Sequence, residues 1–186
     1  MLKTSMNALV LSSGGIDSTA CIVYYLNTGM RVTPIFVDFG HPSNEVECKH
    51  VRQIAAYYKL TLREIKVGGL DCRQQGEIKG RNAAFVTIAL MAFPNSPGIV
   101  ALGIHAGSPY YDCTPAFADR MSGLVSEYTN GLMQFEAPFL NFEKPSIVAF
   151  GKKHGLPFDL TYSCQKGAES PCGTCLSCLD RKVLGL

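Results

Sequence analysis

The sequence lacks any apolar run long enough to cross a lipid bilayer. A membrane-spanning helix needs about 20 apolar residues, whereas the longest apolar runs here, such as residues 85–93, are short and contain Thr87. The net charge is only +2, which is too small to favour nucleic-acid binding by charge alone. No internal repeat, low-complexity stretch or signal-like first segment is visible. These absences predict one cytoplasmic domain over residues 1–186, with no membrane partner and with enough chain to bury a core.

Cysteines, in contrast, are plentiful, because the chain has 8 of them. Half are scattered, and the other half stand in a Cys-x7-Cys-x2-Cys-x2-Cys array within residues 164–178. Such spacing is typical of tetrahedral zinc with four sulfur ligands, and a filled tetrahedron leaves no position for a substrate. We therefore predict a structural zinc that folds residues 163–186, with an iron–sulfur cluster, disulfides or free thiols as alternatives. The predicted ligands are Cys164, Cys172, Cys175 and Cys178.

Near the other end, an apolar segment over residues 8–12 runs into a Ser-Gly-Gly-x-Asp-Ser-Thr sequence at positions 13–19. Two glycines let the backbone turn sharply and approach a ligand, and a helix starting here aims its free N–H groups at an anion. No Lys follows the second glycine, so this differs from the Gly-x4-Gly-Lys loop that holds a phosphate destined for transfer. An ordinary helix start capped by Asp17 or Ser18 is the alternative. The residues predicted to bind a nucleotide are Leu11, Ser13, Gly14, Gly15, Asp17, Ser18 and Thr19.

Strand and helix patterns alternate along the chain. Apolar patterns predict strands at residues 8–12, 32–39, 61–67 and 99–103, and helices at residues 18–27, 44–58, 82–93, 115–129 and 145–154. Pro34 should mark the beginning of the second strand or an edge position, because it cannot donate to a strand ladder, and Asn44 is expected to cap the second helix. This order implies a parallel α/β sheet covered on both faces, with ligand above the carboxyl ends of the strands. The glycine-rich loop, Asp38 and Gly103 all fall at such ends.

The segment at positions 13–19 resembles the PP-loop, the pyrophosphate-binding loop of ATP pyrophosphatases. With Asp38-Phe39-Gly40-His41, Gly80-Arg81-Asn82, Gly103 leading to Tyr111-Asp112-Cys113, and the cysteine array, the whole chain resembles the 7-cyano-7-deazaguanine synthase family. The resemblance implies a Rossmann-like PP-loop fold with a C-terminal zinc knuckle. It also implies an ATP-dependent conversion of 7-carboxy-7-deazaguanine to the nitrile with ammonia, on the route to queuosine and related deazapurines. The implied cofactors are ATP, magnesium and zinc.

The chemistry suggests catalytic roles for Asp17, Asp38 and Arg81. When a carboxylate attacks the α-phosphorus of ATP, the charge on the departing pyrophosphate must be offset by N–H donors, magnesium and a cation. Asp17 or Asp38 is expected to hold the magnesium. Arg81 is the preferred cation for a phosphate or a substrate carboxylate, although a solvated position at a helix start is its alternative.

The predicted substrate-binding residues are Arg81, Asn82, Tyr111, Asp112 and Cys113. Asp112 and Cys113 rest on the resemblance alone. Asn82 is either a ligand or a helix cap, and Tyr111, with its neighbour Tyr110, either stacks on a flat purine or belongs to the core.

The chain departs from the resembled family around the expected substrate. Asp38-Phe39-Gly40-His41-Pro42 replaces an Asp-Tyr-Gly-Gln-Arg-His segment, and Thr114 stands where Arg is expected. His41 is either a base, a contact to the adenylate, or an exposed loop residue. The acceptor is therefore ammonia or, alternatively, a protein or peptide amine, as in synthase-like proteins of some antiviral systems. A nucleotide- and nucleic-acid-binding module, a tRNA thiolase and the oligomeric state, including a homodimer, are further open alternatives.

Overall fold

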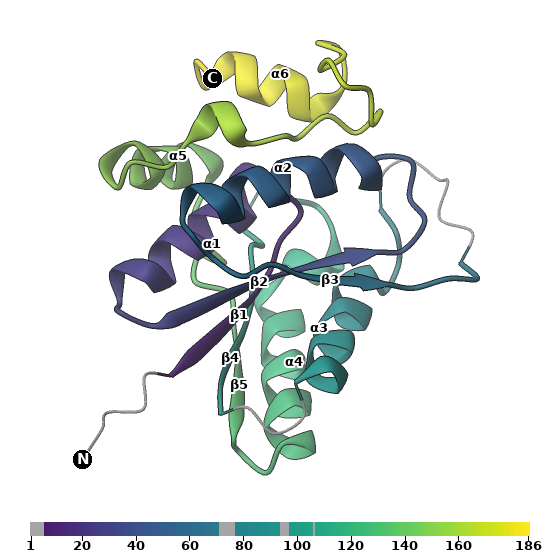
Figure 1. Ribbon diagram of the computed structural model, residues 1–186, viewed down its shortest axis with the longest axis vertical. Helices are drawn as coiled ribbons and strands as arrows, with labels where there is room; N and C mark the ends of the chain where they lie inside the picture. Colours follow the sequence, from purple (N-terminus) through teal and green to yellow (C-terminus); the bar gives the residue numbers. More distant parts are fainter. Residues whose placement is uncertain (1–5, 71–76, 94–96, 106) are drawn as a thin grey trace.

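A parallel β-sheet forms the centre of the chain, whose computed structural model describes residues 6–70, 77–93, 97–105 and 107–186 (Figure 1). Its strands pair in the order β3-β2-β1-β4-β5, and every pairing is parallel. The prediction of a parallel α/β sheet is therefore confirmed. The strands are β1 (Asn7–Leu11), β2 (Arg31–Asp38), β3 (Arg63–Lys66), β4 (Gly98–Leu102) and β5 (Met133–Glu136).

Helices cover both faces of this sheet (Figure 1). One layer contains α1 (Ile16–Asn27), α2 (Asn44–Tyr57) and α5 (Lys144–Lys153). The opposite layer contains α3 (Arg81–Ala92) and α4 (Pro115–Tyr128). The C-terminal helix α6 (Leu176–Val183) lies outside the first layer, and single helical turns form η1 (Tyr111–Cys113) and η2 (Phe158–Leu160).

Strand β1 is buried on both of its faces, as a central parallel strand must be. Ala8 and Val10 point into a core shared with α1 and α5. Leu9 and Leu11 point into the other core, which packs against α3 and α4. Successive side chains of a strand alternate between faces, so this one strand anchors both apolar layers.

Pro34 lies inside β2 without a missing ladder bond. The carbonyl of Ile35 accepts the amide of Ser12 at 2.8 Å, so the backbone N–H and C=O groups of Ile35 point toward β1. The backbone groups of the preceding residue, Pro34, point toward the opposite neighbour. On that side β3 begins pairing only at Ile35. Pro34 therefore stands at an unpaired edge of β2, one of the two positions that the sequence allowed.

The predicted cap at Asn44 is wrong, and the capping alternatives for Asp17, Ser18 and Asn82 are not observed. Helix α1 begins at Ile16 with Gly15 as its N-cap, so neither Asp17 nor Ser18 caps it. Ser43, not Asn44, precedes α2, and Gly80 precedes α3, so Asn82 is not a cap either. Two of these side chains make other contacts: Asn44 donates to the carboxylate of Asp38, and Asp17 accepts from Lys144.

Two elements were missed from the sequence. Strand β5 is only four residues long, with Met133 and Phe135 facing the core, which is too short to separate from a loop by its pattern. Helix α6 lies within the cysteine array, where the spacing of metal ligands hides a helical pattern.

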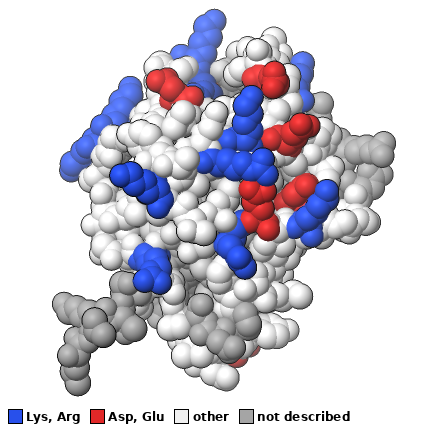
Figure 2. Space-filling model, viewed as in Figure 1, with Lys and Arg blue, Asp and Glu red and all other residues white. Residues whose placement is uncertain are grey.

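The outer surface carries charges of both signs. Lys and Arg lie interspersed with Asp and Glu on the face drawn in Figure 2. On the protein surface, the exposed residues Arg52 and Glu64 form a pair, and their guanidinium and carboxylate make two hydrogen bonds of 2.6 and 2.7 Å. Within the described residues, no helix is both long enough and apolar enough to cross a membrane.

Gly103 follows β4 and passes very close to the start of α1. A Cβ at this position would lie 2.7 Å from the backbone carbon of Asp17 and 2.7 Å from the backbone nitrogen of Ser18. Both are backbone atoms, so neither can rotate away. The contact between β4 and the loop after β1 therefore requires glycine here.

We predict that Gly103→Ala destabilises the protein by roughly 1–3 kcal/mol, because the new methyl group overpacks a rigid contact. The matched control is Gly123→Ala on the exposed face of α4, where a Cβ meets no atom within 4 Å. That change should be stabilising by about 0.5–1 kcal/mol, since alanine is the better helix former. Chemical unfolding of both variants measures the difference, and equal stabilities would contradict the close contact.

Candidate active site

A cavity of about 390 Å³ opens above the carboxyl ends of the central strands. Its wall includes Ser13 and Asp17 from the loop after β1, Arg81 from the start of α3, and Asp112 from η1. Lys144 at the start of α5 and residues of the C-terminal segment complete it. The structure thus brings together segments that are far apart in the sequence, at the position where parallel α/β sheets bind ligands.

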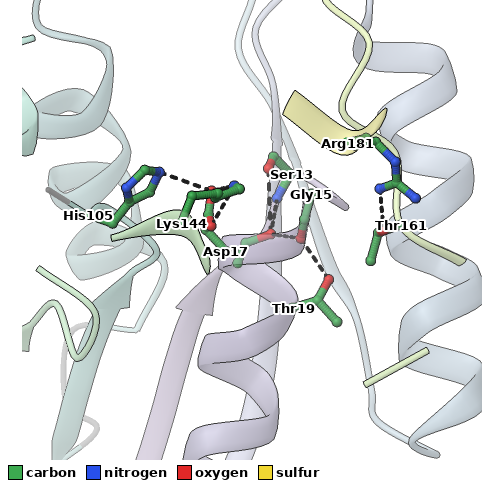
Figure 3. A network of polar contacts seen from close by, with 9 residues as sticks. Ser13, Gly15, Asp17, Thr19, His105, Lys144, Thr161 and Arg181 are labelled. Carbon is green, nitrogen blue, oxygen red and sulfur yellow. Dashed lines mark hydrogen bonds and ion pairs between the residues drawn. The ribbon is translucent and has the colours of Figure 1, made fainter. Parts of the chain in front are cut away.

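The loop after β1 forms a tight turn held by hydrogen bonds (Figure 3). Gly14 has a φ of +77°, and a Cβ there would lie 3.1 Å from the carbonyl oxygen of Glu47. The hydroxyls of Ser18 and Thr19 donate to the carbonyl of Gly15 at 3.2 and 2.8 Å. The amide of Ser13 donates to the Ser18 hydroxyl at 3.3 Å. These bonds hold the first turn of α1, whose amides have no partner within the helix.

The predicted loop residues divide into two groups. Those that line the cavity are Leu11, Ser13, Gly15, Asp17 and Ser18. Gly14 and Thr19 are not part of the lining, and Thr19 is fully buried. Gly14 supplies the positive φ of the turn, and the Thr19 hydroxyl donates to the carbonyl of Gly15.

Asp17 is paired with a lysine that sequence analysis missed. The ammonium group of Lys144 donates to the two carboxylate oxygens of Asp17 at 2.7 and 2.5 Å (Figure 3). Nε2 of His105 lies 3.7 Å from the same carboxylate. The two residues of the main pair are 127 positions apart in the sequence, so no local spacing could have indicated Lys144.

The expected substrate residues are largely brought together. Arg81, Asn82, Asp112 and Cys113 all line the cavity. Burial raises the pKa of the Cys113 thiol. The thiol therefore stays neutral near pH 7.

Tyr111 does not line the cavity; its neighbour Tyr110 does. The Tyr111 side chain is 49% exposed and its ring packs edge-on against Phe117, with centroids 5.9 Å apart. Thr114, where the resemblance predicts Arg, caps α4 by accepting the amide of Phe117 at 3.3 Å.

Asp38 lies outside this cavity, in a second hollow lined by residues of β2, β3 and α2. Its carboxylate accepts hydrogen bonds from the Asn44 side chain at 2.7 Å and from the amide of Gly40 at 3.1 Å. These bonds, chiefly that of Asn44, lower the pKa of Asp38. The structure therefore does not bring Asp38 together with Asp17, and it shows Asp38 holding the turn after β2.

Glu47 on α2 is a second lining residue that sequence analysis missed. Its carboxylate accepts the hydroxyl of Ser43 at 2.8 Å, and the Ser43 hydroxyl lies 2.7 Å from Nδ1 of His41. His41 also lines the cavity. Glu47 belongs to no recognised motif. The only hint in the sequence is its position one helical turn after Ser43.

The C-terminal segment closes one side of the cavity. The amide of Tyr162 donates to the carbonyl of Gly14 at 2.8 Å, so the segment is bound directly to the loop. Arg181 on α6 lines the cavity and donates to the Thr161 hydroxyl at 2.7 Å and to the carbonyl of Phe158 at 3.2 Å (Figure 3). Burial lowers the pKa of Arg181, and the hydrogen bonds position its guanidinium at the rim.

The four predicted metal ligands form a compact cluster. Their sulfur atoms all lie within 4.8 Å of one another, and those of Cys172 and Cys178 are 4.0 Å apart. Four sulfurs around one ion at about 2.3 Å would lie roughly 3.8 Å apart, so the donor set fits a tetrahedral metal. Hydrogen bonds, chiefly from Thr174, lower the pKa of the Cys172 thiol to about 5. No disulfide joins the cysteines that the structure describes.

Solved structures with the same architecture establish the class of fold. NMN synthetase from Francisella tularensis has a TM-score of 0.55 over 86% of this chain and 65% of that chain, at 14% identity. The U34-tRNA thiolase NcsA from Methanococcus maripaludis has a TM-score of 0.57 over 98% of this chain and 65% of that chain, at 12% identity. At such identities the likeness shows the fold alone. Together with the loop and the cavity, it defines an α/β protein with a PP-loop fold.

Sequence comparison establishes the family. A family model described as "Queuosine biosynthesis protein QueC" matches residues 7–75 and 71–184. A 7-cyano-7-deazaguanine synthase from Rhizobium johnstonii is 36% identical over 95% of this chain and 86% of its own length. One from Oceanobacillus iheyensis is 30% identical over 94% of this chain and 91% of its own length. The chain belongs to the QueC family.

We predict that the purified chain carries one metal ion held by the cysteine cluster. Cys172→Ser should lose that ion and lower the melting temperature, because metal binding contributes folding free energy. Cys48→Ser is the matched control, since Cys48 is a buried free thiol outside the cluster. Elemental analysis and thermal unfolding with and without a chelator measure both effects. An unchanged metal content in the Cys172 variant would contradict the assignment.

Proposed function

We propose that this chain is a 7-cyano-7-deazaguanine synthase that adenylates 7-carboxy-7-deazaguanine with ATP and converts it to the nitrile with ammonia. The observation that carries the proposal is the single cavity in which the PP-loop meets Arg81, Asp112 and Cys113. The names of the QueC-family relatives support the product. We infer that the protein is a soluble, cytoplasmic enzyme that acts on small molecules. Its oligomeric state stays a prediction.

The loop and its neighbours can hold the triphosphate of ATP. The unpaired amides of the first turn of α1 and the hydroxyls of Ser13 and Ser18 face an anion at this position. Lys144 supplies the cation that the loop sequence itself lacks, and it reaches the loop from α5. These groups would stabilise the charge on pyrophosphate as it departs.

Magnesium fits the carboxylate side of this arrangement. Asp17 offers carboxylate oxygens at the cavity wall, the ligand type that magnesium prefers. The ion would neutralise phosphate charge when bound. If Asp17 held magnesium, the ammonium of Lys144 would be free to bind phosphate oxygens, so the two residues of this pair could hold the ion and the phosphate respectively. In this proposal Asp38 positions the turn after β2 and does not hold the metal.

Arg81 is proposed to bind the carboxylate of the acid substrate. A guanidinium matches a carboxylate with two parallel hydrogen bonds, and Arg81 lines the cavity beside Asn82 and Asp112. Asn82, Asp112 and Cys113 would contact the heterocycle. Tyr110 takes the place at the wall that was predicted for Tyr111.

Zinc is the proposed occupant of the cysteine cluster. Four thiolates are a donor set that zinc fills completely in structural sites. The ion would stabilise the C-terminal segment and take no part in the reaction. An iron–sulfur cluster needs the same ligand type, so metal analysis decides between the two.

Product analysis tests the function. The protein is incubated with ATP, magnesium, 7-carboxy-7-deazaguanine and ammonium chloride, and the deazapurine is followed by mass spectrometry. We expect the nitrile, AMP and pyrophosphate. A stable adduct formed only with added peptide amines would support the peptide-ligase alternative. Release of ADP, or AMP formation without any deazapurine, would contradict the proposal.

We predict that Lys144→Ala slows the release of pyrophosphate by about 100-fold to 1,000-fold, as expected when a group that stabilises developing charge is lost. Asp17→Ala should have a similar effect, with a weaker dependence on magnesium. Lys153→Ala is the control, because Lys153 is exposed at the other end of α5. A pyrophosphate-release assay measures all three variants. Full activity in the Lys144 variant would contradict a role for Lys144 in stabilising the departing pyrophosphate.

A further inference from the structure

Glu47 is a carboxylate at the wall of the cavity that the adenylation step leaves without a role. It lies in the first turns of α2, where the neighbouring Glu45 is exposed to solvent. The Glu47 side chain instead lines the cavity together with Arg81 and Tyr162. An acidic group that could face solvent but faces a ligand cavity is a candidate for proton transfer.

The Glu47 carboxylate is held by a short chain of hydrogen bonds. The Ser43 hydroxyl donates to Oε1 at 2.8 Å. Nδ1 of His41 lies 2.7 Å from that hydroxyl and 3.2 Å from the backbone nitrogen of Ser43. His41 and Ser43 therefore fix the direction in which Glu47 points.

Charged and titratable groups from several elements line the cavity together with Glu47. They are Arg81 of α3, Tyr162 of the segment after η2, and His41 before α2. Arg81 and Tyr162 interact electrostatically with Glu47. Burial raises the pKa of Glu47, whereas the Ser43 hydrogen bond and the positive charge of Arg81 lower it. The carboxylate is thus a stronger base than an exposed glutamate.

We propose that Glu47 is the general base that accepts the proton of the attacking nitrogen, and that Ser43 and His41 position it. This inference rests on the proposed function. The location of Glu47 favours the role, because Glu47 lines the same cavity as Arg81, the proposed partner of the substrate carboxylate. His105 also lines the cavity, but it lies against Asp17 on the loop side.

The step is balanced without any further reactant. The lone pair of ammonia forms a C–N bond with the carbonyl carbon of the acyl-adenylate. The C–O bond to AMP breaks, and AMP leaves with that electron pair. One N–H proton passes to the Glu47 carboxylate, which leaves the amide as the first nitrogen-containing product.

A purely structural role for Glu47 is the competing explanation. Ser43 and Glu47 are four residues apart, and such a pair can stabilise the start of a helix by a few tenths of a kcal/mol. A structural role predicts a small loss of stability and equal effects on all reaction steps. A base predicts an effect on nitrogen transfer alone.

The test separates the two half-reactions in Glu47→Gln. Exchange of labelled pyrophosphate into ATP, dependent on 7-carboxy-7-deazaguanine, measures adenylation. Nitrogen transfer is measured by adding ammonium chloride to enzyme preloaded with the acid and ATP, then quenching and detecting the amide and nitrile. We expect exchange within a few-fold of wild type and nitrogen transfer slowed at least about 100-fold. The matched control, Glu45→Gln, should change neither.

The pH dependence tests the positioning residues. Wild-type nitrogen transfer should fall as the pH drops through the pKa of Glu47, and the ratio of wild-type to Glu47→Gln rates removes the protonation of ammonia itself. Ser43→Ala removes a contribution that lowers the pKa, so the fall should move to higher pH. An unmoved midpoint would overturn the positioning role.

The outcomes distinguish this inference from the proposed function. If the wild-type protein shows no pyrophosphate exchange dependent on 7-carboxy-7-deazaguanine, both the proposed function and the role of Glu47 as a base are contradicted. If exchange occurs and Glu47→Gln transfers nitrogen at the wild-type rate, only the inference is overturned. Equal slowing of both half-reactions, with a lower melting temperature, would assign Glu47 a structural role.

Discussion

The site depends on backbone contacts that fix the turn between β1 and α1. The carbonyl of Gly14 accepts the amide of Tyr162 at 2.8 Å, and Gly103 brings β4 so close that a Cβ there would lie 2.7 Å from the backbone of Asp17. The first turn of α1 cannot shift without breaking these contacts. Its unpaired amides are therefore already directed when a ligand arrives, so little conformational freedom is lost on binding.

The cavity holds an ion pair at the loop, where the carboxylate of Asp17 is neutralised by Lys144. Farther along the wall, the positive charge of Arg81 favours the ionised form of the half-buried Glu47 carboxylate. The pairing of Asp17 with Lys144 limits the penalty of holding these two charges away from water. An entering phosphate can then replace Asp17 as the partner of Lys144, so binding exchanges one ion pair for another.

The sequence was informative wherever a feature is local. The PP-loop, the cysteine cluster and the long strands depend on residues that are neighbours in the chain, and the structure places them as expected. Contacts between distant segments were not predictable: Lys144 meets Asp17 across 127 positions. Asp38 was expected in the site because it ends a central strand, but Asn44 and Gly40 bind its carboxylate in a separate hollow. Strand position alone does not determine where a side chain points.

The cysteine cluster and the loop are mechanically connected through Tyr162. Its amide binds the carbonyl of Gly14, its ring stacks on His50 with centroids 5.0 Å apart, and Cys164 follows two residues later. A metal on the cluster fixes Cys164 and therefore limits where Tyr162 can lie. Because Tyr162 also lines the cavity, loss of the metal should disturb the turn after β1 before it disturbs the sheet. A metal whose ligands are all protein sulfurs can in this way control catalysis without contacting a substrate.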